Sequence, residues 1–304
     1  MKVLITTSTF GETNNKPLQI LKGANFEVIN NRYKRKITQT ELIQLLDGVQ
    51  GVIAGLEMYD YDILSKSELK VISRCGSGLS NIDLETAKKM CITVYNTPEG
   101  PTQSVAELTV GCLLSLIRDV PRANNLMHLG KWQKFTGHLI EDMNVLVIGY
   151  GRIGKTVAKI LSAIGANILV HDPFVNKNEI LPSFKRVALK DGIESADVIT
   201  LHSSGANMVL GVNEFALMKE GVYILNASRG GLIDEDALER ALISGQVAGA
   251  WLDTFNQEPY SGSFSKYNQV ILTPHIGSYT EEGRYKMEIE AANNLLLGLN
   301  ISAS

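Results

Sequence analysis

The sequence has few cysteines, and their arrangement indicates neither a disulfide nor a metal site. Cys75, Cys91 and Cys112 are odd in number, form no CxxC pair and stand in apolar contexts typical of small buried residues. The five histidines have no ligand-like spacing such as HxxxH. We therefore expect no bound metal ion, and reduced thiols predict a cytoplasmic protein.

Long apolar runs and an excess of basic residues are also missing. No run approaches the roughly 18 residues that a membrane-spanning helix needs, and the N-terminal MKVLITTSTF enters a strand-like segment without a secretion signal. The 29 basic and 32 acidic residues leave a formal charge of −3, so nothing indicates a nucleic-acid partner. The 304 residues, 44% of them hydrophobic, suit a soluble protein of two domains.

Strand-like and helix-like segments alternate along the chain, which predicts an α/β fold with parallel sheets. In the first half we expect strands at 3–6, 26–29, 51–54, 71–73 and 93–95, with helices at 40–46 and 84–89. Pro98 and Pro101 flank a linker-like segment, after which Ser104 would cap a helix over 105–118. A last helix is expected over about 281–299, with apolar positions at Ile289, Leu295, Leu296 and Leu299.

A glycine fingerprint for a dinucleotide lies in the middle of the chain. The apolar run 145–148 predicts a buried strand, and Gly149, Gly151 and Gly154 complete GxGxxG before a helix-periodic stretch. The glycines allow a sharp turn, a close approach of the backbone to a pyrophosphate, and tight packing of helix on strand. The helix N-terminus would then bind the phosphates.

An acidic residue at the end of the next predicted strand indicates which dinucleotide binds. Asp172 lies 18 residues after Gly154, about the spacing at which an acid accepts hydrogen bonds from the adenosine ribose. A carboxylate at this place repels a 2′-phosphate, and the following Pro173, Phe174 and Val175 offer no arginine. We therefore predict NAD as the cofactor, in preference to NADP.

Three residues in the second half of the chain together suggest hydride-transfer chemistry on a hydroxy or oxo acid. Arg229 stands in NASRGGLIDEDAL, Glu258 in DTFNQEP and His275 in LTPHIGS. An arginine can donate two hydrogen bonds to a carboxylate, a histidine can exchange a proton near neutral pH, and a glutamate can orient it. Taken singly, the three also fit a surface arginine, a loop carboxylate and a strand-end histidine bonded to the backbone.

These strings, with SRCGSGLSNID at 73–83 and NTPEGPTQSVAELTVG at 96–111, resemble motifs of the D-isomer-specific 2-hydroxyacid dehydrogenase family, in family order. The resemblance covers nearly the whole chain and is strongest to the branch of D-3-phosphoglycerate dehydrogenases and hydroxypyruvate or glyoxylate reductases. It implies an NAD-dependent oxidoreductase that moves hydride at C2 of a D-2-hydroxy acid or 2-oxo acid, in the manner of a D-3-phosphoglycerate dehydrogenase. The alternative is a reductase of hydroxypyruvate, glyoxylate or another unphosphorylated 2-oxo acid. Some relatives are non-catalytic NAD sensors of the corepressor type, which is the alternative from another class.

The resemblance also implies a role for each motif residue. His275 would be the acid/base, Glu258 would pair with it, and Arg229 would bind the substrate carboxylate and 2-oxygen. The backbone of Gly76, Ser77 and Gly78 would hold the substrate carboxylate. The cofactor would be bound at the pyrophosphate by Gly149, Gly151, Arg152, Ile153 and Gly154, at the ribose by Asp172, and at the nicotinamide carboxamide by Asp253.

The architecture implied by the resemblance is two doubly wound, Rossmann-like domains. Residues 1–98 and 282–304 would form a discontinuous substrate-binding domain, and residues 99–281 the NAD-binding domain, with the substrate in the cleft. The segment after Arg118, including Trp132 and Phe135, would contribute to a homodimer. Because the chain ends after one terminal helix, we expect no regulatory domain.

Two departures from the family pattern affect the substrate. Phosphoglycerate dehydrogenases usually have an arginine just after the third strand, directed at the phosphate, but this sequence has Ala54 there, in GVIAGLEMYD. Arg74, Lys131 or Lys134 would have to replace it. The loop SSGANMVLG after His202 is shorter by about three residues than the family loop beside the nicotinamide. A phosphorylated substrate and an unphosphorylated one such as hydroxypyruvate or glyoxylate therefore both stay open.

Overall fold

The computed structural model describes residues 1–205 and 207–300, and its contacts divide the chain into two compact units. Unit 1 consists of Met1–Thr102 and the chain from Ser278 onward, and unit 2 is Gln103–Gly277. The loop after His202 contains Ala206 and the chain end contains 301–304, so the expectations for these residues lie partly outside the described residues. In the described ranges, no helix is both long and apolar enough to cross a membrane.

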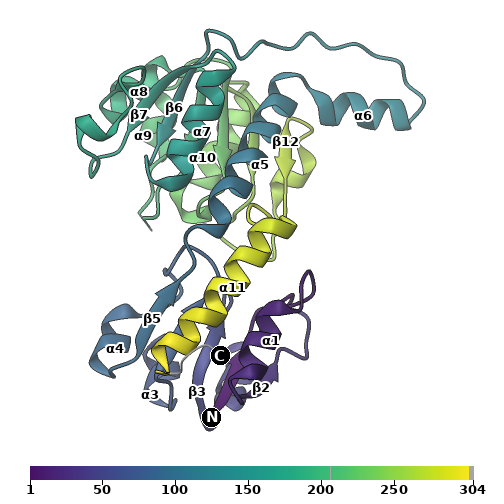
Figure 1. The fold of residues 1–304 in the computed structure, drawn as a ribbon. Coiled ribbons are helices and arrows are strands. Elements are labelled where there is room, and N and C mark those ends of the chain that lie inside the picture. The colour runs from purple at the N-terminus through teal and green to yellow at the C-terminus, as the bar shows by residue number, and fades with distance from the viewer. Residues whose placement is uncertain (206, 301–304) are drawn as a thin grey trace. The chain divides into compact units, whose positions relative to one another are not determined.

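Unit 1 is built on a parallel sheet of five strands among the described residues, in the order β2-β1-β3-β4-β5 (Figure 1). The strands are β1 (Lys2–Ile5), β2 (Glu27–Asn30), β3 (Val49–Ala54), β4 (Val71–Arg74) and β5 (Thr93–Asn96). The helices are α1 (Lys16–Gly23), α2 (Gln39–Leu45), α3 (Tyr61–Ser65), α4 (Leu84–Lys89) and α11 (Glu281–Gly298). The order reverses direction at β1 and β3, as in a doubly wound sheet.

Helix α11 covers one face of the unit 1 sheet beside α1, although it is far away in sequence. Leu295 and Leu296 are buried as expected, but Ile289 is only partly buried. The apolar pattern missed Arg284 and Glu288, which are buried and form an ion pair of 2.6 Å. Because each charge offsets the other, both residues can lie on the buried face of α11, where a pattern of apolar residues alone predicts no charged side chain.

The helix expected at 105–118 begins earlier than predicted. Helix α5 (Gly100–Ile117) already includes the segment that reads as a linker, and Ser104 lies inside the helix, so it is not the cap. Pro101 does not oppose this start, because the first turn of a helix has backbone N–H groups without intrahelical partners, and proline lacks only that group. Two prolines close together were therefore a poor guide to a break in the chain.

Unit 2 has a parallel sheet of seven strands among the described residues, in the order β12-β11-β10-β9-β6-β7-β8. The strands are β6 (Asn144–Ile148), β7 (Asn167–His171), β8 (Lys185–Arg186), β9 (Val198–Leu201), β10 (Val222–Asn226), β11 (Val247–Leu252) and β12 (Val270–Leu272). The α-helices are α6 (Val120–His128), α7 (Arg152–Ala163), α8 (Leu189–Ser195), α9 (Val212–Ala216) and α10 (Glu235–Ser244), and the short 3-10 helices are η1 (Lys177–Glu179), η2 (Gly230–Leu232) and η3 (Ser263–Lys266).

The central strands of unit 2 are apolar on both faces, which explains their parallel arrangement. Apart from the half-buried Asn144, every residue of β6, β9 and β10 is buried, and separate apolar clusters lie on the two sides of the sheet. Such strands need helices on both faces. The predicted fold class, two Rossmann-like α/β domains, is confirmed.

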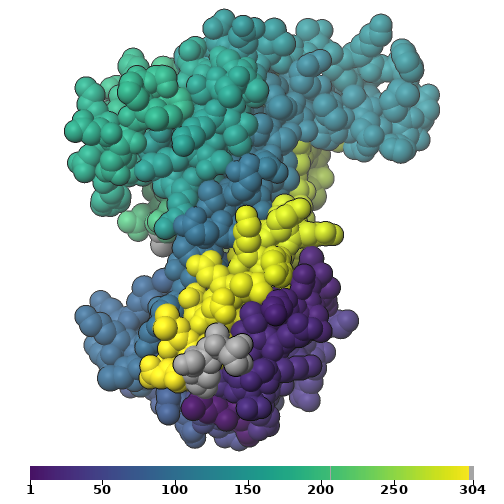
Figure 2. All heavy atoms as spheres, in the orientation of Figure 1, coloured from purple at the N-terminus to yellow at the C-terminus, as the bar shows by residue number. Residues whose placement is uncertain are grey.

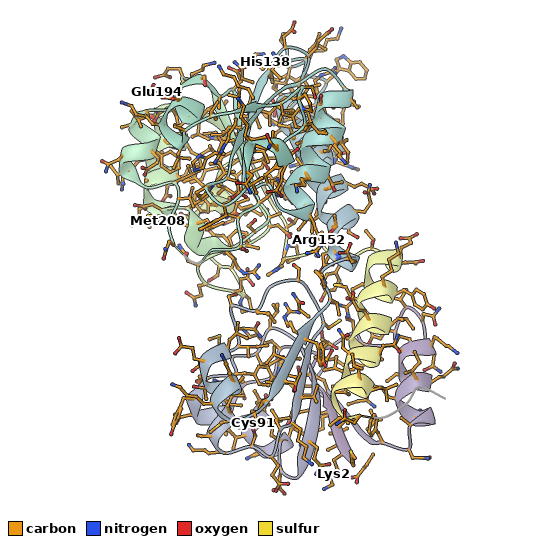
Figure 3. All side chains as sticks on the ribbon, turned by 60° about the vertical axis from the view of Figure 1, so that its left-hand side comes forward. Lys2, Cys91, His138, Arg152, Glu194 and Met208 are labelled. Carbon is orange, nitrogen blue, oxygen red and sulfur yellow. The ribbon has the colours of Figure 1, made fainter. Side chains whose placement is uncertain are left out.

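Parallel strands place all their carboxyl ends at one edge of a sheet, and the labelled side chains of Figure 3 mark the two edges. In unit 2, His138 and Glu194 lie at the end where strands begin, and Arg152 and Met208 lie at the end where strands finish. In unit 1, Lys2 and Cys91 mark the amino edge. Each predicted site residue follows a strand, so all of them belong to carboxyl edges.

Helix α6 differs from the other α-helices of unit 2 because none of its residues is buried. With the extended segment that follows it, α6 forms an arm that projects from the rest of unit 2 (Figures 1 and 2). The arm, residues 120–139, carries Trp132 and Leu139 at 79% and 70% exposure, respectively, together with Met127 and Leu129. An apolar segment that its own unit does not cover is suited to contact with another surface.

The cysteines correct one expectation. Cys75 and Cys112 are buried, and burial raises the pKa of their thiols to about 11 and about 12. Cys91 is exposed, contrary to its apolar context, because it lies in the turn after α4 with φ 58°. In the described ranges, no group of three histidine, cysteine or acidic side chains could hold a metal ion.

Candidate active site

The glycine fingerprint forms a tight turn from β6 into α7. Gly149 has φ 92°, and a Cβ atom there would lie 2.5 Å from the backbone nitrogen of Ser203. A Cβ at Gly154 would lie 2.0 Å from the carbonyl oxygen of Gly149. At both positions the neighbouring backbone atoms therefore leave no room for a side chain, so glycine is required whether or not a cofactor binds.

The second glycine of the fingerprint has a different environment. Gly151 is the N-cap of α7, and a Cβ there would meet no atom within 4 Å. The turn thus leaves open space in front of the first backbone N–H groups of a helix of twelve residues. Free N–H groups and the positive end of the helix dipole suit a pyrophosphate, so the residues at this turn fit the predicted cofactor.

Asp172 is held in place at the end of β7 by two backbone amides. Tyr150 N donates to Oδ2 at 2.7 Å and Phe174 N donates to Oδ1 at 2.9 Å. The first bond ties the acid directly to the fingerprint turn. Each carboxylate oxygen keeps a further lone pair for a ribose hydroxyl.

An arginine from another strand lies beside Asp172, although the three residues that follow Asp172 offer none. Arg186 at the end of β8 is exposed, and its Nη2 donates to the backbone oxygen of Asp172 at 3.5 Å. The expectation considered only the three residues that follow Asp172 in sequence. The pairing of β7 with β8 brings in a residue from 14 positions further along the chain.

Arg229 is positioned by an asparagine turn at the end of β10. The side chain of Asn226 accepts from Ser228 N at 3.0 Å and donates to the backbone oxygen of Arg229 at 2.8 Å. The guanidinium donates from Nη1 to the oxygen of Ser228 at 2.6 Å. Burial lowers the pKa of Arg229, and the charge of Glu258 opposes that change. An arginine nevertheless stays charged at neutral pH.

The loop after β11 packs closely on the Arg229 turn. A Cβ at Gly230 would lie 2.0 Å from the carbonyl carbon of Phe255, so only glycine permits this approach. In the same loop, Phe255 N donates to Oε1 of Glu258 at 3.2 Å, which orients that carboxylate.

Glu258 and His275 form a hydrogen-bonded pair. Oε2 of Glu258 lies 2.9 Å from Nδ1 of His275, and the side chains are 30% and 31% exposed, respectively. A carboxylate acceptor at Nδ1 fixes the ring so that Nε2 is left for another partner. The Glu258–Pro259 peptide bond is cis. The two residues are 17 positions apart in sequence, and the adjacent strands β11 and β12 bring them together.

Asp253 holds the backbone around His275. Its Oδ1 accepts from Thr273 Oγ1 at 2.6 Å and from Ile276 N at 2.8 Å, and its Oδ2 accepts from Gly277 N at 2.8 Å. His275 has φ 56°, a conformation that a non-glycine residue keeps only when its surroundings impose it. No sequence motif indicated this positioning contact, nor the roles of Asn226 and Thr273.

In unit 1, the loop Gly76–Gly78 follows β4. Gly76 has φ 145°, and a Cβ there would collide with the guanidinium of Arg74. Its N–H already donates to Thr97 Oγ1 at 2.7 Å. Of the three predicted amides, those of Ser77 and Gly78 therefore stay available to an anion, since they have no acceptor among the residues that the structure describes.

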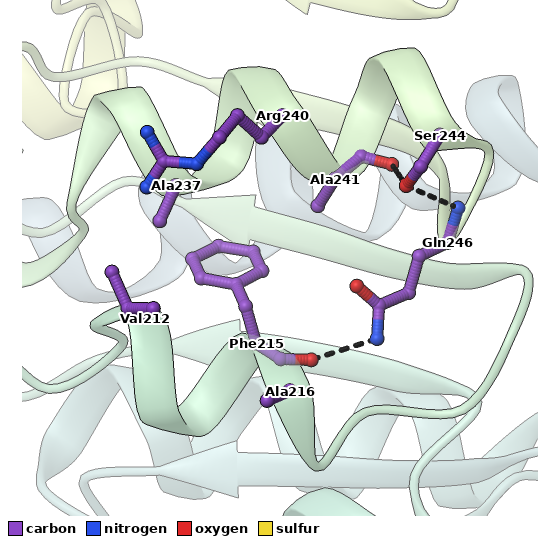
Figure 4. A pocket seen from close by; sticks show the side chains of 8 residues that line it. All are labelled: Val212, Phe215, Ala216, Ala237, Arg240, Ala241, Ser244 and Gln246. Carbon is purple, nitrogen blue, oxygen red and sulfur yellow. Dashed lines mark hydrogen bonds between the residues drawn. The ribbon is translucent and has the colours of Figure 1, made fainter.

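A pocket of about 270 Å³ lies elsewhere in unit 2, between α9 and α10 (Figure 4). Its wall combines Phe215 and several alanines with Arg240 and Gln246, and Nε2 of Gln246 donates to the oxygen of Phe215 at 2.7 Å. None of its lining residues belongs to the predicted site. The predicted chemistry therefore depends on the carboxyl edges and not on this hollow.

His202 also lies at the carboxyl edge of unit 2, directly after β9. It is half-buried as a residue, its Nε2 lies 2.8 Å from Thr200 Oγ1, and burial lowers its pKa to about 4. The ring is therefore neutral at neutral pH.

A doubly wound parallel sheet with this fingerprint turn and an acid after its second strand defines unit 2 as a dinucleotide-binding domain. The sequence model of a family described as "D-isomer specific 2-hydroxyacid dehydrogenase, NAD binding domain" matches residues 110–277. The chain belongs to the D-isomer-specific 2-hydroxyacid dehydrogenase family, and its cofactor is NAD.

Three relatives illustrate the similarity. A D-3-phosphoglycerate dehydrogenase of Pongo abelii is 36% identical over 284 residues, which cover 90% of this chain and 52% of the relative. The TT0316 protein of Thermus thermophilus has a TM-score of 0.90 at 30% identity, covering 99% of this chain and 97% of that one. The NAD+-bound 3-phosphoglycerate dehydrogenase of Entamoeba histolytica has a TM-score of 0.80 at 26% identity, covering 96% and 93%. The chain spans about half the length of the curated relatives that it matches.

Proposed function

We propose that this protein is an NAD-dependent oxidoreductase that interconverts a 2-oxo acid and a D-2-hydroxy acid. The observation that carries the proposal is the Glu258–His275 pair of 2.9 Å, on the edge of the sheet that also presents Arg229. A proton donor and a fixed cation at the carboxyl edge of a dinucleotide-binding sheet are the groups that this reaction requires.

The proposed reaction assigns one task to each side chain. When bound, NADH supplies the hydride that reaches the carbonyl carbon. His275 donates a proton from Nε2 to the carbonyl oxygen, or accepts one in the direction of oxidation. Glu258 holds Nδ1 and stabilises the protonated ring. Arg229 binds the substrate carboxylate and the oxygen on which negative charge develops.

Backbone groups and acids complete the proposed site. We propose that Ser77 and Gly78, with Gly76 shaping the loop, bind the substrate carboxylate. Gly149, Gly151, Arg152, Ile153 and Gly154 hold the pyrophosphate, and Asp172 holds the ribose. For Asp253 we propose contact with the nicotinamide carboxamide in addition to its bonds around His275. Its Oδ2 accepts only from Gly277 N among the bonds described above, so this oxygen keeps a lone pair for the carboxamide.

The choice of cofactor should depend on Asp172. NADH should give a kcat/KM at least about tenfold above that of NADPH, because the fixed Asp172 carboxylate opposes a 2′-phosphate. Asp172→Ala should reduce this ratio, and Arg186 would then be the nearest cation to the phosphate. Steady-state rates with both reduced cofactors measure the ratio, and Asp191→Ala in α8 is the matched control. A preference for NADPH would contradict the assignment of Asp172.

The exposed arm, residues 120–139, is suited to self-association. We propose a cytoplasmic homodimer in which this arm contacts a second copy.

Light scattering at micromolar concentration should give about twice the chain mass, because burying several apolar side chains supplies most of the association energy. Trp132→Ser combined with Leu129→Ser should shift the mass to that of one chain. Ile243→Ser, at 68% exposure on α10, should not. A single-chain mass for the unaltered protein would refute the dimer.

The proposed activity is tested by following NADH oxidation with phosphohydroxypyruvate, hydroxypyruvate, glyoxylate, pyruvate and 2-oxoglutarate. The relatives named as D-3-phosphoglycerate dehydrogenases make the first compound the natural starting point, and the absence of an arginine at Ala54 makes the unphosphorylated compounds its competitors. Reduction of at least one compound is expected. Tight NADH binding without any turnover would instead favour a sensor.

A further inference from the structure

Unit 1 contains a buried carboxylate without a neighbouring cation in an ion pair. Glu57 is only 3% exposed. Its Oε2 accepts from the hydroxyl of Thr6 at 2.7 Å, and its Oε1 accepts from Ile37 N at 3.4 Å. Both donors are neutral, and no ion pair of Glu57 occurs among the residues that the structure describes. Its field is therefore not cancelled by a directly paired charge.

The position of Glu57 is where an open parallel sheet binds its ligand. Such sheets take ligands outside the carboxyl ends of the strands, at the point where the strand order reverses. In unit 1 that point lies between β1 and β3. Glu57 follows β3 by three residues and bonds to Thr6, which follows β1 directly. The carboxylate therefore sits at the reversal point itself.

The strand order also shows on which side of Glu57 the proposed substrate-binding loop lies. The loop proposed to hold the substrate carboxylate, Gly76–Gly78, follows β4, and β4 is the neighbour of β3 on the side away from β1. The guanidinium of Arg74 is packed against Gly76 and Cys75, at the β4 end. A substrate anchored at that loop would extend its far end over the ends of β3 and β1, toward Glu57.

Several buried hydroxyl groups surround this part of the edge. The side-chain oxygens of Thr7 and Thr9 are buried and have no hydrogen-bond partner within the described ranges, and the Tyr59 hydroxyl lies near Thr6 and Glu57. Burial first, and then the Glu57 charge, raises the pKa of Tyr59. These groups are suited to hydrogen bonds with small polar substituents, since an unsatisfied buried hydroxyl gains most from a partner.

From this arrangement, and on the basis of the proposed function, we infer that Glu57 is a specificity-determining residue that disfavours a phosphate on the substrate. The preferred 2-oxo acid would carry a hydroxyl or another uncharged or hydrogen-bond-donating group at its far end. A phosphate brings a charge of about −1.5 to −2, which a carboxylate in a poorly solvated edge repels. Gly55 lies close to this carboxylate, since a Cβ there would lie 2.8 Å from Oε2 of Glu57.

The test compares Glu57→Gln with the unaltered protein and with Glu27→Gln. Glutamine keeps the shape of the side chain and one acceptor oxygen, which can face Ile37 N, but removes the charge. Its amide nitrogen can then donate to the hydroxyl of Thr6, which also accepts hydrogen bonds. Glu27→Gln removes the same charge from the exposed amino end of β2, at the opposite edge of the same sheet. For each protein, kcat/KM is measured with phosphohydroxypyruvate and with hydroxypyruvate. Thermal shifts with 3-phosphoglycerate and with glycerate measure binding independently of turnover.

The unaltered protein should prefer hydroxypyruvate. Glu57→Gln should raise the ratio of the two kcat/KM values, phosphorylated over unphosphorylated, by about tenfold or more, and Glu27→Gln should leave the ratio within about twofold. A preference of the unaltered protein for the phosphorylated compound, or an unchanged ratio in Glu57→Gln, overturns the inference. If no oxo acid is reduced, the proposed function fails by itself. Equal stabilisation of the unaltered protein and Glu57→Gln by 3-phosphoglycerate then also overturns the inference, and stabilisation of Glu57→Gln alone supports it.

Discussion

Replacing His275 with alanine should lower kcat for oxo-acid reduction by roughly 10²–10⁴-fold, the usual contribution of a positioned general acid. The proposed proton source at Nε2 would be lost, whereas the cofactor-binding turn at Gly149 to Gly154 would be unchanged. NADH should therefore still bind with nearly its normal affinity. Stopped-flow or steady-state absorbance at saturating NADH gives kcat, and fluorescence titration of NADH gives the binding constant.

Two further variants separate catalysis from folding in this experiment. His138→Ala removes a histidine at the amino edge of the same unit, away from the site, and should retain activity. Glu258→Gln leaves an acceptor for Nδ1 but removes the charge that stabilises the protonated ring, so its kcat should fall between those of His275→Ala and the unaltered protein. A His275→Ala protein with nearly full kcat would remove His275 from the mechanism.

The parts of the fold that could be predicted well from the sequence are those that depend on local pattern. Short apolar runs bounded by polar residues placed the strands of unit 1 to within two residues. The strands β1, β3 and β4 are almost wholly buried, and the edge strands β2 and β5 are partly exposed. The helix over 84–89 is found at those bounds, and Asp83 accepts from Thr86 N as its cap. The predicted start of α5 was wrong, because a proline fits both a linker and the first turn of a helix, and Pro101 lies in that first turn.

Some contacts in the folded protein could not be predicted from sequence patterns. Arg284 and Glu288 are buried because each neutralises the other, and a hydropathy period treats both as exposed positions. Arg186 approaches Asp172 only through the pairing of β8 with β7. Glu57 reads as an ordinary loop acid until the strand order places it at the reversal point of the sheet. For Arg186 and Glu57 the missing information was which strands are neighbours.

For the candidate site, the residue types could be read from the sequence, but their neighbours depend on the strand order. Arg229, Glu258 and His275 stay predicted catalytic residues, but the adjacency of β10, β11 and β12 explains how residues 46 positions apart at most can serve one edge. The residues that hold them, Asn226 and Asp253, lie at or just after strand ends too. A search for polar side chains at the end of each predicted strand would have found both.

Replacing Arg229 with alanine should lower kcat/KM for the oxo acid by roughly 10²–10⁴-fold. Two charge-assisted hydrogen bonds to the substrate would be lost, each worth about 1.5–3 kcal/mol. Because the same guanidinium is proposed to bind the carboxylate and the developing alkoxide, both KM and kcat should deteriorate. Arg229→Lys should recover only part of the loss, since a single ammonium cannot reproduce the planar fork.

The turn at Arg229 should keep its structure without the guanidinium. It is held by bonds from the Asn226 side chain to the backbone at 228 and 229, and these do not use the arginine side chain. Arg229→Ala should therefore keep its fold and its NADH affinity, which circular dichroism and fluorescence titration check. Arg240→Ala on α10 is the matched control, and it should change neither kcat nor KM. A loss confined to kcat, with KM unaltered, would show that Arg229 does not bind the carboxylate in the ground state, and Ser77 and Gly78 would then have to hold it alone.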